Sequence, residues 1–524
     1  MGDENNVTSL GQTPWLHFVA AAFSGMGLAL SFPDYGIWPL AWFTVAPFLL
    51  TLGGKTPSQG AKLGFVFGLF YFGPTLTWLS NTMIHFGHMP VWLAALVNGL
   101  GIVYVSFFTA FFGWLVAWIG RRAGEEAALA FSPLLWVAVE LLRSHAPPLA
   151  FPWARIADSQ YLFITFIQVA DFCGEEGAGF VMLAVNMALA RIISWKMTRG
   201  PFPLRWTALA FFIFAGCLVY GQVSVGKYSR PEGKAVHVAL LQGNIDQARK
   251  WDRNYTREQA RMYVTMTLDA ASKGASLVVW PEAAATFFFG KDAYYDGLMK
   301  EVAHMGGASI FFGASDYEQI EGRDVSYNSA WLLSPAGDAK KYDKVRLAPF
   351  GEYVPLPRLL FFVHQIAHSV GDMTPGEKLF TLDTASYKMG PQICFEIIFP
   401  QYSAQLSAMG AQALVNITND SWFGVSPASR QSLSMAVFRA VENRTPLLRA
   451  AQSGVSAIIA PDGRITDQTG LFVQTTLHGN FVPRQGPPTA YSLYGWFLAW
   501  IYPVGALAAI LWASMLGRRK PTLH

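Results

Sequence analysis

The chain has 524 residues, of which 52% are hydrophobic, 15% aromatic and only 14% charged. Because soluble domains carry about a quarter charged residues, this composition predicts a membrane protein. The net charge of +4 is small, and no basic run with interleaved aromatic residues suggests a nucleic-acid partner. Three cysteines are too few for a disulfide framework, and no cysteine–histidine cluster predicts a metal site.

Long apolar segments fill the first part of the chain and return near its end. They lie at 14–31, 36–53, 62–79, 90–119, 127–145, 160–195, 206–223 and 491–516. Each is near or above the ~20 residues that cross the hydrocarbon core of a bilayer. The N-terminus lacks the basic region of a secretory signal, so we expect the first segment to remain as a helix. We predict eight spans, the sixth of which, interrupted by Gly174 and Gly177, either bends or begins at the interface.

The charges of the loops predict the orientation of these spans. Basic residues concentrate in the second, fourth and sixth loops and in the C-terminal tail, at Lys55, Lys62, Arg121, Arg122, Lys196, Arg199, Arg205, Arg518, Arg519 and Lys520. Because basic loops stay in the cytoplasm, an even number of spans places both termini there. The region between the seventh and eighth spans then faces outward, which in a bacterium is the periplasm.

That outward region has an ordinary charge density and a mixed pattern. Runs rich in Val, Ile, Leu and Phe predict strands at 236–244, 276–282, 309–315, 327–334, 391–396 and 413–419. Helical patterns lie between several of them, at 256–274 and 428–444. This order predicts sheets covered by helices. We therefore expect a seven-helix transmembrane region at 1–230, an α/β domain at 231–487, and a final transmembrane helix with a cytoplasmic tail at 488–524.

Three polar residues of the α/β domain end or follow strands: Glu282, Lys344 and Cys394. Each alone fits an ordinary role, as a helix cap, a solvated charge or a small buried hydrophobe. Together they can perform acyl transfer without a metal or cofactor. The carboxylate can remove the thiol proton as a general base, and the ammonium can stabilise the thiolate and a tetrahedral oxyanion.

The motifs around these residues resemble the nitrilase (carbon–nitrogen hydrolase) superfamily. The matching stretches are VVWPE with Glu282, YDKVRLAPFGEYVP with Lys344 and ICFE with Cys394. Together with the eight predicted spans, they narrow the resemblance to the apolipoprotein N-acyltransferase family. Further matches are LLQGNIDQARKW, FPW, NITNDSWFG and TPLLRAAQSGVSAII. The resemblance implies an αββα sandwich in which Cys394 is the nucleophile, Glu282 the general base and Lys344 the oxyanion partner.

The resemblance also implies supporting residues in the active site, namely Trp251, Glu352, Phe395, Glu396 and Trp422. Glu352 would orient Lys344 or assist proton transfer, and Glu396 would be a second carboxylate beside the nucleophile. Both carboxylates have an alternative role as structural partners of backbone amides or of Lys344, and Trp251 has core packing as its alternative. Phe395 stands where the family often has a tyrosine, so no role of a phenolic hydroxyl is carried over.

The activity implied by the resemblance uses two lipidic substrates. A phospholipid, typically phosphatidylethanolamine, would donate its sn-1 acyl chain to Cys394 as a thioester. The α-amine of the N-terminal diacylglyceryl-cysteine of an apolipoprotein would then take the acyl chain in a ping-pong reaction. We expect a monomer in the bacterial inner membrane. The alternatives are a membrane-tethered amidase or nitrilase-type hydrolase with the same triad, and a transporter or scaffold with an inactive outer domain.

Two further features carry expectations of their own. The short apolar stretches 285–290 and 359–370 suit loops that dip into the outer leaflet, with burial in the core as the alternative. Four carboxylates lie within the predicted spans, at Glu140, Asp171, Glu175 and Glu176. Because ionised groups are costly in lipid, we expect them to serve at interfaces or in helix packing rather than in catalysis.

Overall fold

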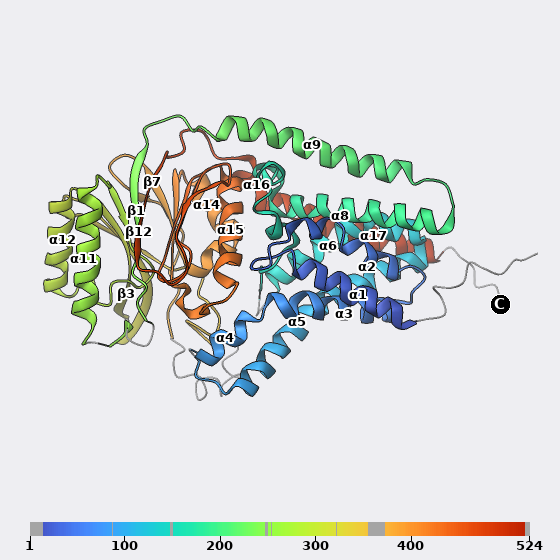
Figure 1. Ribbon diagram of the computed structural model, residues 1–524, viewed down its shortest axis with the longest axis horizontal. Helices are drawn as coiled ribbons and strands as arrows, with labels where there is room; N and C mark the ends of the chain where they lie inside the picture. The colour runs from blue at the N-terminus through green and yellow to red at the C-terminus, as the bar shows by residue number, and fades with distance from the viewer. Residues whose placement is uncertain are drawn as a thin grey trace, which may run out of the picture. The chain divides into compact units, whose positions relative to one another are not determined.

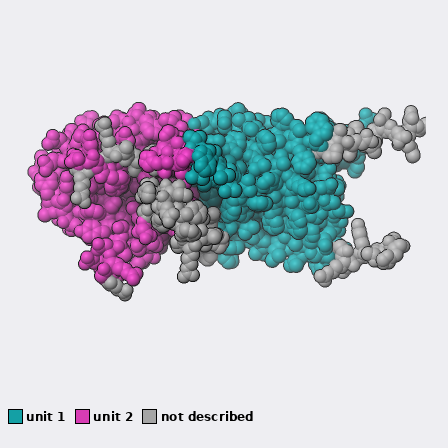
Figure 2. All heavy atoms as spheres, turned by 90° about the horizontal axis from the view of Figure 1, so that it is seen from below, with its two compact units in different colours: residues 1–80, 91–222, 496–524 teal, residues 81–90, 223–495 magenta. Residues whose placement is uncertain are grey.

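The computed structural model describes residues 14–85, 87–146, 150–246, 250–252, 254–320, 322–354 and 372–518. The chain divides into two compact units, coloured separately in Figure 2. A helical unit comprises residues 1–80, 91–222 and 496–524, and an α/β unit comprises residues 81–90 and 223–495. The short stretch 81–90, which begins within helix α4 (Trp78–His85), thus belongs with the α/β unit.

The first part of the chain and its C-terminal end are helical (Figure 1). The described α-helices here are α1 (Pro14–Ala29), α2 (Val45–Thr51), α3 (Pro57–Thr75), α4 (Trp78–His85), α5 (Val91–Ala123), α6 (Glu125–His145), α7 (Ile164–Ile167), α8 (Ala170–Thr198), α9 (Leu204–Tyr228), α16 (Ala490–Leu498) and α17 (Ile501–Arg518). Two 3₁₀ helices, η1 (Trp38–Trp42) and η2 (Ile156–Gln160), lie between them.

By length and composition, four described helices could cross a membrane: α5, α6, α8 and α9. Helices α3 and α4 add a fifth span if they count as one, although the chain bends by 51° between them. Shorter apolar helices cover Trp15–Ala29, Trp38–Thr51 and Ile501–Leu516, where the first, second and last predicted spans lie. The described helices therefore support a multi-pass helical region with four or five full-length spans.

Helix α8 contains the break that the sequence indicates. Gly174 has φ 69° and ψ 179°, which is not helical, so two helical segments meet at this residue. Such a conformation suits glycine because it lacks a Cβ atom. The predicted interruption of the sixth apolar segment is therefore a bend at Gly174.

Buried charges of the helical unit are paired within it. Arg155 lies 3.5 Å from a carboxylate oxygen of Glu175 and 2.9 Å from one of Glu176. The Ile156 N–H donates to Glu140 at 3.0 Å. The Tyr220 hydroxyl likewise donates to Asp171 at 2.8 Å. These contacts join helices to each other and to the segment after α6, so the four carboxylates have the packing roles expected from the sequence.

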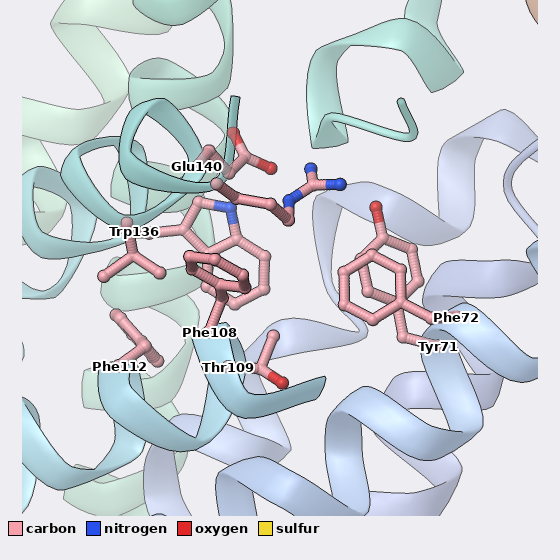
Figure 3. A pocket seen from close by; sticks show the side chains of 9 residues that line it. Tyr71, Phe72, Phe108, Thr109, Phe112, Trp136 and Glu140 are labelled. Carbon is pink, nitrogen blue, oxygen red and sulfur yellow. The ribbon is translucent and has the colours of Figure 1, made fainter. Parts of the chain in front are cut away.

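A small pocket lies between α3, α5 and α6 (Figure 3). It is lined by Tyr71, Phe72, Phe108, Thr109, Phe112, Trp136, Val139, Glu140 and Arg143. The guanidinium of Arg143 donates to the backbone oxygens of Phe151 at 3.3 Å, Ala154 at 3.1 Å and Trp153. Backbone carbonyls thus accept the hydrogen bonds of the Arg143 guanidinium. Aromatic rings form most of the remaining wall of the pocket.

The α/β unit contains two six-stranded sheets, with strand orders β12-β1-β2-β3-β4-β5 and β11-β10-β9-β8-β7-β6. The first sheet consists of β1 (Val236–Gln242), β2 (Leu277–Val279), β3 (Ser309–Ile320), β4 (Arg323–Leu333), β5 (Ala339–Asp343) and β12 (Thr475–Phe481). The second consists of β6 (Leu382–Asp383), β7 (Lys388–Ile393), β8 (Ala413–Thr418), β9 (Leu447–Ala451), β10 (Ala457–Ile459) and β11 (Ile465–Gln468).

Helices cover the outer faces of both sheets (Figure 1). Helices α11 (Thr256–Ser272) and α12 (Ala293–Gly306) flank the first sheet, and α14 (Pro400–Ala408) and α15 (Ala428–Asn443) flank the second. Residues of β1 contact β9, and residues of β4 contact β7, so the sheets pack face to face. The predicted αββα layering is therefore present.

Parallel pairing brings the ends of the central strands together. In the first sheet β1, β2 and β3 run parallel, and in the second β7, β8 and β9 do. The carboxyl ends of parallel strands share one sheet edge, which is where α/β proteins place functional loops. Glu282 follows β2 and Cys394 follows β7 at such edges.

The strands and helices predicted in this unit are found, with one difference in a strand. The predicted strand 391–396 ends at Ile393, and Cys394–Ile398 form the 3₁₀ helix η3. The expectation that 285–290 dips into the leaflet is wrong for two of its phenylalanines. Phe287 and Phe289 are only 6% and 3% exposed and belong to the core beside β3, because the chain turns back over that sheet. The stretch 359–370 lies outside the described residues.

We predict that Arg155→Met destabilises the helical unit. The substitution leaves Glu175 and Glu176 buried without their cation, and breaking a buried ion pair costs about 3–5 kcal/mol. Thermal unfolding of the full chain in detergent should therefore begin at a clearly lower temperature. Arg205→Met is the matched control, because the Arg205 side chain is 81% exposed. Equal melting of the two variants would contradict a structural role for Arg155.

Candidate active site

Glu282 lies in a sharp turn directly after β2. Ala283 has φ 47°, in the left-handed region, and the turn rests on Gly313 of β3. A Cβ atom at Gly313 would come within 2.7 Å of the Glu282 Cα, so this strand position needs glycine. Glu282 is 7% exposed. Its Oε2 accepts from the Asn419 N–H at 2.8 Å, which fixes the carboxylate from the second sheet.

Lys344 follows β5 and lies between two carboxylates. Its Nζ is 2.8 Å from Glu352 Oε2, 2.9 Å from Glu352 Oε1 and 3.5 Å from Glu282 Oε1. Burial alone would lower the pKa of this amine, but the charges of Glu352 and Glu282 outweigh it and raise the pKa above its ordinary value. Lys344 is therefore a fixed cation at physiological pH and suits the stabilisation of an anion.

Cys394 begins η3 in a conformation that is rare for residues other than glycine. Its φ is 49°, and backbone of this kind concentrates at functional sites. Burial, followed by the charge of Glu282, raises the pKa of the thiol to about 12, although Lys344 and a hydrogen bond with Thr418 oppose the shift. The thiol is thus neutral at pH 7, so a reaction at this sulfur needs a base to remove the proton.

The three residues predicted to form a triad occupy one cluster. The charge of Glu282 raises the pKa of both Cys394 and Lys344, and the charge of Cys394 also raises the pKa of Lys344. Glu282 and Lys344 come from the first sheet, whereas Cys394 comes from the second. The arrangement joins a proton acceptor, a fixed cation and a thiol, which is the set that acyl transfer through a thioester requires.

Glu352 contacts Lys344 directly, as the resemblance implied. Its Oε2 also accepts from the Ala348 N–H at 2.7 Å, and its Oε1 accepts from Asn328 Nδ2 at 2.7 Å. Glu352 is 9% exposed. These contacts favour the role of orienting Lys344, because each carboxylate oxygen of Glu352 contacts Lys344 and also accepts a hydrogen bond from a second donor.

Glu396 is completely buried and accepts four hydrogen bonds. Its Oε1 accepts from the N–H groups of Val345 at 2.7 Å and Arg346 at 3.1 Å and from the Tyr342 hydroxyl at 2.9 Å. Its Oε2 accepts from the Ile393 N–H at 2.8 Å. One carboxylate thus joins the end of β7 to the segment after Lys344. Burial raises the pKa of Glu396 to about 7, although the donors and Lys344 oppose the shift. These contacts favour a positioning role.

The aromatic residues implied by the resemblance differ in their surroundings. Trp251 is 52% exposed, so core packing, its alternative role, is excluded. Phe395 is partly buried and its ring packs edge-on against Phe399, with centroids 5.3 Å apart. Trp422 is partly buried in the 3₁₀ helix η4 (Asp420–Phe423), within the loop that supplies the Asn419 N–H.

A buried ion pair holds that loop. Asp420 Oδ2 accepts from Arg449 of β9 at 2.9 Å and from the Ser429 hydroxyl at 2.5 Å. Arg449 also donates to the side chain of Asn416 at 2.5 Å. At the far end of the loop, Asn81 donates to the backbone oxygen of Phe423 at 2.9 Å. The NDSWFG motif is therefore anchored on both sides of the residues that face Glu282.

Sequence reasoning missed two residues of this cluster. Asn328 in β4 donates its amide Nδ2 to Glu282 Oε1 and to Glu352 Oε1, both at 2.7 Å. Lys250 is completely buried, and its Nζ donates to the backbone oxygen of Glu282 at 3.1 Å. Asn328 gave no signal inside an ordinary strand pattern. Lys250 lies within LLQGNIDQARKW, where only the following tryptophan was singled out. Among the described residues, no group of His, Cys, Asp and Glu could hold a metal ion.

Comparisons with known proteins assign both units. The model of the apolipoprotein N-acyltransferase N-terminal domain matches residues 24–188, and that of carbon-nitrogen hydrolase matches residues 237–482. An apolipoprotein N-acyltransferase from Geobacter metallireducens is 38% identical over 520 residues, covering 98% of this chain and 97% of the relative. The chain belongs to the apolipoprotein N-acyltransferase family. Another member, from Methylococcus capsulatus, is 32% identical and covers 95% of this chain and 96% of the relative.

The carbon–nitrogen hydrolase match falls on the α/β unit. The carbon-nitrogen hydrolase match begins within β1 and ends just after β12, so it spans the αββα layers. A solved nitrilase-superfamily protein from Saccharomyces cerevisiae has 19% identity and a TM-score of 0.38, and covers 48% of this chain and 93% of its own.

We predict that Glu396→Ala lowers both the stability of the α/β unit and the reactivity of Cys394. The change leaves three backbone N–H groups buried without an acceptor, and each such loss costs about 1–3 kcal/mol. Thermal unfolding and Cys394 alkylation by iodoacetamide measure the two effects. A variant that loses reactivity but melts as the wild type does would instead assign Glu396 to the chemistry alone.

We predict that Asn328→Asp slows alkylation of Cys394 by at least about tenfold at pH 7.5. The substitution replaces the shared donor of Glu282 and Glu352 by a third negative charge, which opposes thiolate formation. Asn254→Asp on the exposed surface is the matched control. The bridging role is contradicted if both aspartate variants react at the wild-type rate.

Proposed function

We propose that this chain transfers an acyl chain from a phospholipid to the α-amine of the N-terminal diacylglyceryl-cysteine of apolipoproteins. The observation that carries the proposal is the cluster of buried Glu282 and Lys344 with Cys394 in a chain that belongs to the apolipoprotein N-acyltransferase family. A thiol with a raised pKa beside a carboxylate and a fixed cation suits covalent acyl transfer.

In the first half-reaction, Glu282 accepts the proton of Cys394 as the sulfur attacks an ester carbonyl carbon of the phospholipid. The Lys344 ammonium stabilises the oxyanion of the tetrahedral intermediate. As the intermediate collapses, the ester C–O bond breaks and Glu282 returns the proton to the leaving oxygen. The products are a thioester on Cys394 and a lysophospholipid. We propose the sn-1 chain of phosphatidylethanolamine as the donor.

In the second half-reaction, the neutral amine of the lipoprotein cysteine attacks the thioester carbonyl carbon. Glu282 accepts a proton from the amine, the C–S bond breaks, and the proton returns to the sulfur of Cys394. The product carries an amide bond, and the free thiol is regenerated. In this scheme Glu352 orients Lys344, Glu396 positions the segments on either side, and Trp251, Phe395 and Trp422 contact the substrates.

We further propose how the chain lies in its membrane. Residues 1–230 would supply seven spans and 488–524 the eighth, with both termini in the cytoplasm and 231–487 as the periplasmic catalytic domain of an inner-membrane protein. The three shorter apolar helices support the spans beyond the full-length ones. A monomer suffices, because one chain supplies all of the proposed triad.

We predict that mixing the purified chain with phosphatidylethanolamine gives an acyl adduct on Cys394 that passes to a diacylated lipopeptide amine. Intact-protein and peptide mass spectrometry follow both steps. Cys394→Ser should abolish the transfer and leave membrane insertion and melting unchanged, because the serine is nearly isosteric. An adduct lost only to water would identify a hydrolase with the same triad. No adduct at all would favour a chain without enzymatic activity.

A further inference from the structure

Lys250 is a second lysine beside Glu282, the proposed general base, and it lies in the interior of the protein rather than on its surface. Its side chain is completely buried, although lysine is almost never fully buried without a partner. The Nζ donates to the backbone oxygen of Glu282 at 3.1 Å. The Gln259 side chain of α11 donates in turn to the backbone oxygen of Lys250 at 3.1 Å, which ties this position to the helix.

The hydrogen bond from Lys250 holds a turn of unusual backbone conformation. The acceptor is the carbonyl of Glu282 itself, immediately before Ala283 with its left-handed φ of 47°. Left-handed backbone at a residue other than glycine or asparagine persists only where neighbouring groups hold it. Lys250 is one of those groups, so its ammonium contributes to fixing the direction in which the Glu282 carboxylate points.

The charge balance of the cluster also needs Lys250. Two carboxylates, Glu282 and Glu352, face one cation, Lys344. The ammonium of Lys250 brings the cluster to two charges of each sign. Asp420 and Glu396 do not change this balance, because Arg449 pairs with the first and buried donors hold the second. Without Lys250, formation of a thiolate at Cys394 would add a second uncompensated negative charge to a buried site.

We propose that Lys250 is a positioning residue of the active site, whose ammonium holds the Glu282 turn and stabilises the negative charge that develops on Cys394. The electrostatic part rests on the proposed role of Cys394 as nucleophile. The charged groups acting on Lys250 are Glu282, after β2, and Cys394, at the start of η3. Lys344 is already held by Glu282 and Glu352.

This assignment has a consequence for pH. Burial lowers the pKa of Lys250 to about 8, while Glu282 and Cys394 act in the opposite direction. The ammonium is therefore present below pH 8 and is lost above it. Lys344 keeps its proton throughout this range, the thiol has a pKa of about 12, and Glu396 titrates near pH 7. The reactivity of Cys394 should therefore change its pH dependence near pH 8.

The test measures the rate at which iodoacetamide alkylates Cys394 in the full chain in detergent, from pH 6.5 to pH 9.5. Peptide mass spectrometry separates this site from Cys173 and Cys217, which serve as internal references. The variants are Lys250→Met and Lys250→Arg, with Lys300→Met on the exposed face of α12 as the matched control. Thermal unfolding of each variant is recorded in parallel.

We expect Lys250→Met to slow alkylation at pH 7.5 by about tenfold, the factor produced by a rise of about one unit in the thiol pKa. The wild type should show a break in its pH profile near pH 8. Lys250→Arg should remove that break, because arginine keeps its charge across the range. A merely structural lysine would leave the shape of the profile unchanged.

The proposal is overturned if Lys250→Met alkylates at the wild-type rate, or if the break near pH 8 persists in Lys250→Arg. Should Lys250→Met fail to fold, the profile of Lys250→Arg still decides. Incubating the same wild-type sample with phosphatidylethanolamine separates the two proposals. A break that depends on Lys250 without any acyl adduct would reject the acyl transfer and retain the role of Lys250.

Discussion

The placement of one buried cation, Lys344, between two carboxylates is the constraint on which the α/β unit depends. An ammonium removed from water is costly unless opposite charges and hydrogen-bond acceptors surround it. Glu352 lies 2.8 Å away and Glu282 3.5 Å away, and Asn328 links these two carboxylates through its amide. These contacts form only when the turn after β2 and the segment after β5 both lie in their native positions. The burial of Lys344 therefore requires the first sheet to be correctly assembled.

The second sheet is attached to this group by hydrogen bonds to carboxylates. The Asn419 N–H donates to Glu282, and Glu396 accepts from backbone groups on both sides of the cluster. Cys394 follows β7 of the second sheet, and the charges of Glu282 and Lys344 from the first sheet act on its thiol. A thiol whose pKa is raised by burial stays protonated at neutral pH, which lowers its reactivity toward oxidants. The same contacts that join the two sheets therefore place Cys394 beside the buried charges.

Much of this arrangement could be predicted from the chain alone, because local patterns carry it. Alternation and runs of branched residues located β1, β3, β4 and β8, and the spacing of apolar segments located the membrane helices. The motifs around Glu282, Lys344 and Cys394 singled out three residues whose charges act on one another in the structure. The prediction was wrong where an apolar run could equally indicate a membrane-facing loop or a segment of the core. The run at 285–290 is as hydrophobic as a membrane-facing loop, but Phe287 and Phe289 pack into the core beneath α12.

Composition and motif order by themselves determined that the chain is a membrane protein with an inserted α/β domain, and they supplied the thiol, the carboxylate and the amine. Only the tertiary structure decided what surrounds those groups. Lys250 and Asn328 contact Glu282 from positions 32 and 46 residues away in the chain. No local pattern encodes such distances, because burial and hydrogen bonding across two sheets depend on how the layers meet. That is the physical reason why Cys394 could be singled out from the sequence, whereas the groups that surround it could not.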